Sequence, residues 1–137
     1  MSPEMLSAIG VIIIVVLFVL LFLLRRLPKK VKTKYYVRKW REIQRLCGDK
    51  EEWPHAIVHA DMLLDEVLRK RRISGKTMGE RLVNAQNRFS AHDALWTAHK
   101  FANSIRQENS SSTKITEGMV KDALIAFRQA LRDLGAL

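Results

Sequence analysis

An uninterrupted apolar run, residues 5–24, opens the sequence and contains no charged side chain. A helix of this length rises about 30 Å, which is the thickness of the hydrocarbon core of a bilayer. All of its faces are apolar, which excludes an amphipathic helix packed on a soluble core. A cleavable signal peptide is disfavoured because the basic residues follow the run instead of preceding it. The run therefore predicts a transmembrane helix, preceded by a short tail (residues 1–4) and ended near Pro28.

From about residue 35 onward, apolar residues recur at spacings of three and four, and no stretch alternates with period two. This pattern predicts about five amphipathic helices joined by short loops, so that most neighbours run antiparallel. The predicted fold class is therefore all-α: an N-terminal transmembrane helix followed by a small bundle of about five helices over residues 36–137.

Several boundaries of these helices are predicted by residues typical of helix ends. N-terminal signals are a proline in the first turn or a side chain that caps the first backbone N–H groups, and a C-terminal signal is glycine. The residues concerned are Trp53-Pro54, Thr77 with Glu80, Ser90 with Asp93, Thr116 and Gly135.

Charge is concentrated directly after the apolar run. The chain has 24 Lys and Arg against 14 Asp and Glu, and residues 25–45 contain ten of the basic residues and one acid. We expect the segment 25–41 to be a juxtamembrane segment lying against anionic headgroups. A nucleic-acid-binding arm with Tyr35, Tyr36 and Trp40 as stacking partners is the alternative, but the neighbouring membrane helix already explains the charge. The predicted membrane-surface residues are Arg25, Arg26, Lys29, Lys30, Lys32, Lys34, Arg38, Lys39 and Arg41.

The same asymmetry predicts the orientation of the chain. The tail 1–4 has no Lys or Arg, so the positive-inside rule places the N terminus outside and the C-terminal domain in the cytoplasm. We therefore expect a single-pass protein of the cell membrane. The one cysteine, Cys47, excludes an intramolecular disulfide and a four-cysteine zinc site.

Residues that carry out chemistry are few. The sequence has no glycine-rich phosphate loop and no GxSxG motif. His55 and His59 share a helix face, and His92 and His99 could add ligands from another helix, but the spacing does not give a full ligand set, so no metal or cofactor is predicted. Asp61, Asp65 and Glu66 are expected to pair with the basic residues 69–72 one turn along the same helix.

The stretch 94–108 (ALWTAHKFANSIRQE), with Thr77-Met-Gly-Glu-Arg-Leu82 before it and residues 127–135 after it, resembles a family of bacterial single-pass membrane proteins. The soluble part of that family resembles the HEPN helical bundle. Active HEPN proteins are metal-independent ribonucleases whose motif is an Arg, a following polar residue, and a His four to six positions after the Arg.

Aligned on that motif, the Arg position falls on Ala102, the polar position on Asn103 and the His position on Gln107, so only Asn103 matches. Cleavage of RNA at such a site needs a base for the 2′-hydroxyl proton and a cation for the phosphate, and neither alanine nor glutamine supplies them. The resemblance therefore implies the fold without the activity.

Two functions follow. The first is a membrane-anchored interaction or scaffold domain without catalytic activity, which forms a homodimer or binds another protein. The alternative is a membrane-tethered RNA-binding or nuclease-like module with degenerate chemistry, which is the less favoured of the two.

Overall fold

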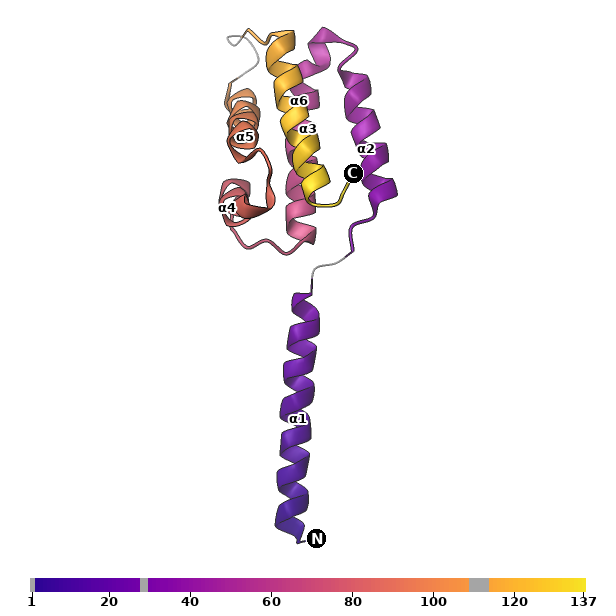
Figure 1. Cartoon of the computed structure of the whole chain (residues 1–137), viewed down its shortest axis with the longest axis vertical. Helices are drawn as coiled ribbons and strands as arrows, with labels where there is room; N and C mark the ends of the chain where they lie inside the picture. Colours follow the sequence, from indigo (N-terminus) through magenta and orange to yellow (C-terminus); the bar gives the residue numbers. More distant parts are fainter. Residues whose placement is uncertain (1, 28–29, 109–113) are drawn as a thin grey trace.

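The computed structural model describes residues 2–27, 30–108 and 114–137, and all regular secondary structure in these residues is helical. This confirms the predicted fold class, a long apolar N-terminal helix followed by a packed bundle of five helices (Figure 1). The α-helices are α1 (Pro3–Arg26), α2 (Thr33–Leu46), α3 (Trp53–Lys70), α4 (Met78–Asn84), α5 (His92–Gln107) and α6 (Glu117–Asp133). Two 3₁₀ turns, η1 (Lys50–Glu52) and η2 (Gln86–Arg88), precede α3 and α5.

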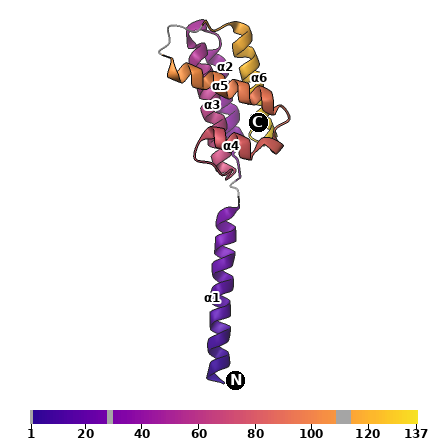
Figure 2. The same cartoon turned by 90° about the vertical axis from the view of Figure 1, so that its left-hand side faces the viewer.

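Helix α1 stands apart from the bundle (Figures 1 and 2). None of its residues, all of which the structure describes, is buried. Its length and composition suit a membrane span, and these features are typical of a membrane anchor or a signal sequence. The helix ends at Arg26, and Leu27 is extended, the conformation favoured before a proline. Pro28 and Lys29 themselves lie outside the described residues.

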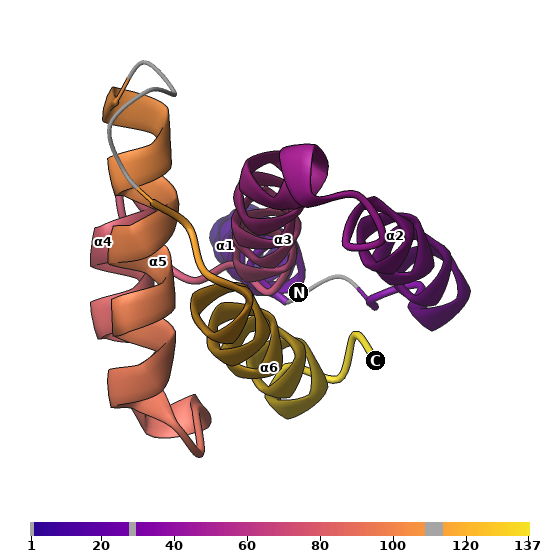
Figure 3. The same cartoon turned by 90° about the horizontal axis from the view of Figure 1, so that it is seen from above.

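In the bundle, α3 is central and packs against α2, α5 and α6 (Figure 3). Helices α2 and α3 are antiparallel, as expected from their short connection. In contrast, α5 lies across the direction of the other long helices (Figure 2), so that α6 returns parallel to α3. The carbonyl of Leu134, after α6, accordingly accepts two hydrogen bonds from Arg71, after α3 (3.0 and 2.6 Å). The expectation of mostly antiparallel neighbours is therefore wrong for α5 and α6.

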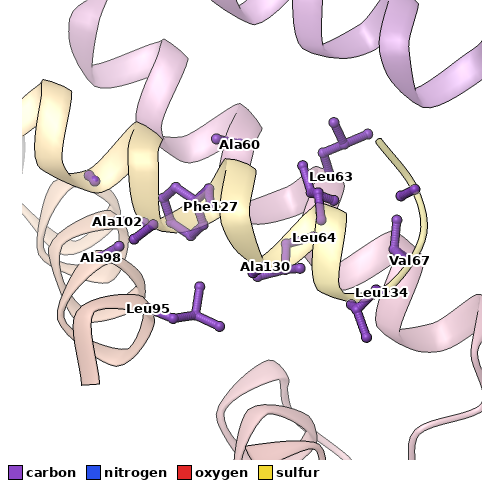
Figure 4. Packing of buried hydrophobic residues seen from close by; sticks show 14 of the residues in the cluster. Ala60, Leu63, Leu64, Val67, Leu95, Ala98, Ala102, Phe127, Ala130 and Leu134 are labelled. Atoms are coloured by element: carbon purple, nitrogen blue, oxygen red, sulfur yellow. The ribbon is translucent and has the colours of Figure 1, made fainter. Parts of the chain in front are cut away.

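The hydrophobic core lies where α3, α5 and α6 meet. Phe127 of α6 is fully buried, and Figure 4 shows its ring between α3 and the small side chains of Ala98 and Ala102 on α5. Small residues on α5 let that helix approach α6 closely although it crosses the bundle. Leu64 and Leu131 are also fully buried in this cluster.

Two of the predicted N-caps are present. The hydroxyl of Thr77 accepts a hydrogen bond from the N–H of Glu80 (3.2 Å), and that of Thr116 accepts one from Met119 (3.3 Å). The Glu80 carboxylate reaches back to the N–H of Lys76 (2.6 Å), one residue before the position expected in a capping box.

The predicted helix start at Ser90 is wrong. Helix α5 begins at His92, and its cap residue Ala91 has no side chain that could bond the first turn. Ser90 instead donates its N–H and its hydroxyl to Asp133 at the end of α6, both at 2.9 Å. The Ser90 side chain, which the local sequence predicts as a helix cap, is therefore engaged in a tertiary contact with Asp133.

Phe127→Ala should strongly destabilise the bundle. Removing a fully buried ring from a packed core costs about 3–5 kcal/mol, which is a large fraction of the stability of a small domain. Thermal unfolding of the full chain in detergent, followed by circular dichroism, measures the loss. Ile125→Ala, on the same helix with a side chain 57% exposed, is the control and should melt close to the parent. Equal melting of the two variants would show that Phe127 is not part of the core.

Candidate functional site

One face of the central helix α3 is left uncovered and forms the floor of a groove with a volume of about 1390 Å³. Helix α2 forms one wall, and α5 with the start of α4 forms the other. Apolar side chains in the groove include Tyr35, Met62, Met78 and Trp96. Its charged side chains are Lys39, Glu42, Asp61, Asp65, Glu66, Arg69, Lys70, Arg72, Lys100 and Arg106.

Asp61 is the most buried charged residue in this groove, with no exposed surface. Its Oδ1 lies 2.8 Å from Nδ1 of His99, and its Oδ2 accepts a hydrogen bond from Nη2 of Arg106 at 2.7 Å. Both partners come from α5, which the carboxylate therefore ties to α3. A buried charge is tolerated only when it is paired and hydrogen-bonded, and Asp61 meets both conditions.

The hydrogen bonds of Asn103 determine the tautomer of His99. Arginine can only donate, so the Asn103 atom that receives Nη1 of Arg106 at 2.8 Å must be the amide oxygen. The Asn103 amide nitrogen then lies toward Nε2 of His99, at 3.3 Å, and makes that nitrogen the acceptor. The proton therefore resides on Nδ1, where it bonds Asp61.

This arrangement resembles, in part, the Asp–His pair of enzymes that use histidine as a general base. In such enzymes the carboxylate orients the ring and Nε2 faces the substrate. Here Nε2 is bonded to Asn103. It also lies close to the start of α4, since a β-carbon placed on Gly79 would be 3.9 Å from it. His99 is only 6% exposed, so the base position is occupied by the protein itself.

A second buried carboxylate, Asp65, lies one turn along α3. Arg81 of α4 binds both of its oxygens (2.8 and 3.1 Å), and Arg69 adds a third bond at 2.8 Å. Arg81 also donates to the carbonyl of Gly75 (2.8 Å), which holds the connection between α3 and α4 in place. The predicted one-turn pairing is therefore confirmed for Asp65 with Arg69, and for Glu66 with Lys70 at 3.8 Å. The partners of Asp61, in contrast, lie on a different helix.

Burial raises the pKa of two further groups. Burial raises the pKa of the Tyr36 phenol, and the nearby Glu66 carboxylate, which accepts its hydrogen bond at 3.2 Å, raises it further. Burial also raises the pKa of the half-buried Cys47 thiol, which donates to the carbonyl of Ile43. At neutral pH the phenol is a hydrogen-bond donor and the cysteine is a thiol, so neither is an activated nucleophile.

The predicted membrane-surface residues are divided among three parts of the structure. Arg25 and Arg26 lie in the last turn of α1, Lys30 and Lys32 are exposed between α1 and α2, and Lys34, Arg38 and Arg41 are exposed on α2. Lys39 is half-buried in the groove and pairs with Glu42 at 3.3 Å. Lys29 lies outside the described residues. Helix α2 runs away from α1 (Figure 1), and the membrane-surface role of these residues stays a prediction.

The three positions of the degenerate motif face different surroundings. Ala102 is fully buried beside Phe127, Asn103 belongs to the Asp61 cluster, and Gln107 is exposed. An arginine at position 102 would place its charge in the core, so the motif could not be restored there without disrupting the packing.

Asp61, His99 and Arg106 were not predicted as a group. The only signal in the sequence is that His99, Asn103 and Arg106 recur at spacings of four and three on one helix face. The packing of α5 on α3, which brings Asp61 to that face, is a tertiary contact that periodicity does not specify.

The histidines singled out as metal ligands do not combine into a ligand set among the described residues. The rings of His55 and His59 are stacked with centroids 6.4 Å apart, and His55 bonds Glu52 at 2.9 Å. His92 stacks on Trp96. Within the described ranges, no group of three or more His, Cys, Asp or Glu is arranged to hold a metal ion.

The sequence matches no family model, and no curated protein and no solved structure shows significant similarity to the chain. A function therefore has to be inferred from α1 and from the chemistry of the groove.

Asp61→Asn should destabilise the protein by about 3 kcal/mol. The change keeps the shape of the side chain but leaves the Arg106 guanidinium and the His99 ring without their carboxylate. Thermal unfolding of the full chain in detergent reports the effect. Asp122→Asn, at an exposed position of α6, makes the same chemical change and should leave the melting temperature unchanged. Similar melting of both variants would show that the Asp61 cluster does not stabilise the packing of α5.

Proposed function

We propose that the chain is a single-pass membrane protein whose bundle is a non-catalytic interaction domain, and that the groove pairs with the groove of a second copy. The observation that carries this proposal is the uncovered face of α3, the helix on which the rest of the bundle packs. Exposed apolar side chains gathered in a groove with a polar rim are typical of a protein interaction site. In the proposed dimer, a second copy packs in the groove and covers this face of α3.

The role of α1 as a permanent anchor is supported by the residues around it. Two arginines occupy its last turn, and further lysines follow before α2 begins at Thr33. In a signal peptide the positive charge precedes the apolar helix, so this order favours an anchor. The same residues favour an N terminus outside and a cytoplasmic bundle.

A second copy suits the groove for two reasons. The lining carries both signs of charge together with apolar side chains such as Met62, which is 57% exposed, so the surface can be complementary to itself. In addition, α3 runs along the direction of α1 (Figure 1), so the groove opens sideways, parallel to the bilayer. Anchoring in one membrane raises the effective concentration of copies that meet in this way.

The absence of catalysis is supported by the state of the polar groups. The carboxylates of Asp61 and Asp65 are each bound by two basic partners, and Nε2 of His99 is bonded to Asn103. The proposed relationship to the HEPN bundle agrees with this interpretation, since its arginine position is the buried Ala102.

A nuclease-like or RNA-binding module is the second candidate, and the Asp61–His99–Arg106 cluster favours it. If Asn103 moved aside, Nε2 could take a proton from a ribose hydroxyl and Arg106, 35% exposed, could bind the phosphate. Exposed Lys100 beside Trp96 would suit a stacked base. Incubating the full chain with RNA in the absence of metal decides between the two. Cleavage that is lost in His99→Ala would overturn the non-catalytic proposal.

The topology can be tested with a reporter fused after Leu137. The fusion should be active with a reporter that works only in the cytoplasm and inactive with one that requires export, because the basic residues that follow α1 are retained inside. The opposite pattern would mean that the bundle lies outside the cell.

Pairing through the groove can be tested by crosslinking, since Cys47 is the only cysteine. In a Cys47→Ser background, Met62→Cys should give covalent dimers in membranes with a short bismaleimide crosslinker. Ile125→Cys is a matched control, because Ile125 is equally exposed (57%) but lies on α6, away from the groove. Dimers that form equally with both variants, or with Ile125→Cys alone, would argue against the groove as the interface.

A further inference from the structure

Exposed cations that are distant in the sequence gather at the end of the bundle that faces α1. They are Lys32 and Lys34 at the start of α2, and Arg72 and Lys76 in the connection from α3 to α4. We refer to these four residues as the basic end. Figure 1 shows that the start of α2 and the segment following α3 both lie at this end of the bundle. Only Lys32 and Lys34 belong to the basic segment that adjoins the membrane helix in sequence.

We propose that the basic end is a docking surface for anionic lipid, which holds the bundle against the membrane at a fixed orientation. This inference does not rest on pairing through the groove. Arg72 also lines the groove, so the test below keeps the copies apart and no second copy covers it. It assigns Arg72 and Lys76, which lie 46 and 50 residues after the end of α1 at Arg26, to the same lipid surface as Lys32 and Lys34.

The first step is the distance to the bilayer. Helix α1 ends at Arg26, and Val31 already packs against the core of the bundle. Five residues of fully extended chain span at most about 18 Å. The edge of the bundle at Val31 therefore stays within that distance of the end of the span, where the headgroup layer is itself about 5–7 Å thick.

The second step is the contact that brings the end of α3 to the start of α2. The Nζ of Lys70 lies over the rings of Tyr35 and Tyr36, 5.7 and 5.6 Å from their centroids. The same lysine lies 3.8 Å from Glu66, which accepts the Tyr36 hydroxyl. The last turn of α3 is therefore fixed beside the first turn of α2, and Arg72 and Lys76 follow it directly.

The third step is that these cations are unneutralised. The basic residues next to them already have partners within the bundle. Arg69 and Arg81 bind Asp65, and Arg71 binds the carbonyl of Leu134. Within the described part of the chain, none of the four side chains of the basic end forms an ion pair. Their charge is free to act on an external anionic surface, and a surface of lipid headgroups is the one that the anchor supplies.

The fourth step is the backbone at Arg72. Helix α3 ends in a Schellman motif, with Ile73 N–H bonded to the carbonyl of Leu68 (3.1 Å) and Arg72 N–H to that of Arg69 (3.0 Å). Arg72 occupies the left-handed position, with φ of 56°. Helix α6 ends in the same motif, but there the position is Gly135, with φ of 75°. Glycine suits this conformation better than arginine does, so folding alone does not account for the arginine at position 72.

The full chain reconstituted in vesicles, at a ratio that leaves one copy per vesicle, provides the test. In a Cys47→Ser background, a fluorophore is placed at Ser74→Cys, an exposed position between Arg72 and Lys76. Lipids with a nitroxide on the headgroup quench the fluorophore when the bundle is docked. Both leaflets contain the same lipids, so the result does not depend on the orientation of the chain.

We expect strong quenching in vesicles containing phosphatidylglycerol, and weak quenching in pure phosphatidylcholine or in 1 M salt, where charges are screened beyond about 3 Å. Each basic residue near an anionic surface changes the docking equilibrium about fivefold. The double variant Arg72→Gly/Lys76→Gln should therefore lower it about 25-fold. Arg72→Gly should at the same time leave the melting temperature unchanged or raise it, which separates loss of docking from loss of fold.

The matched control is Lys50→Gln/Lys121→Gln, which removes two exposed cations near the opposite end of the bundle. This control should keep the quenching of the parent. Equal quenching in the two lipid mixtures, or an equal loss in the control, would overturn the proposal. So would a result in which Arg72→Gly weakens binding of an RNA oligonucleotide but leaves the lipid quenching unchanged, because the basic end would then serve a nucleic acid.

Discussion

The buried carboxylate of Asp61 is the constraint on which the arrangement of the bundle depends. It lies on the central helix α3, and among the described residues its partners are two groups of α5, the charged Arg106 and the hydrogen-bonding His99. A buried carboxylate must keep its paired hydrogen bonds, so the cluster favours the position at which α5 crosses α3. The position of α5 in turn forms one wall of the groove and places Ala98 and Ala102 against Phe127. The polar cluster thus adds a position-specific contact to the apolar packing of α5.

The bundle therefore separates its two kinds of interaction by face. The interface between α3 and α6 is apolar and includes Leu64 of α3 and Phe127 of α6, while the face of α3 toward α5 and α4 carries the two buried carboxylates. The apolar side supplies most of the stability through burial. The polar side borders the groove, where Asp61, Asp65 and His99 are held by hydrogen bonds within the protein.

Sequence periodicity is sufficient for the helices and their approximate ends, because helix formation and capping depend on residues within four positions of one another. Thr77 and Thr116 cap as predicted for this reason. Ser90 does not, because Asp133 from another helix bonds it, and a contact across 43 residues leaves no local pattern. The same limit applies to the groove. His99 is recognisable as a helical residue, but its partner Asp61 becomes apparent only when α5 is seen to cross α3.

The contact between Ser90 and Asp133 also bears on how the fold responds to acid. Partial burial acts to raise the pKa of Asp133, but hydrogen bonds from the Ser90 N–H, Gln129 and the Ser90 hydroxyl outweigh it, so the pKa is lowered. A carboxyl whose pKa is lower in the folded state stabilises the fold above its unfolded pKa and loses that contribution only as the pH falls through the folded value. The turn that leads into α5 therefore stays fastened to the end of α6 throughout mildly acidic conditions. It is released only when the pH is low enough to protonate a carboxyl held below the ordinary range of aspartate.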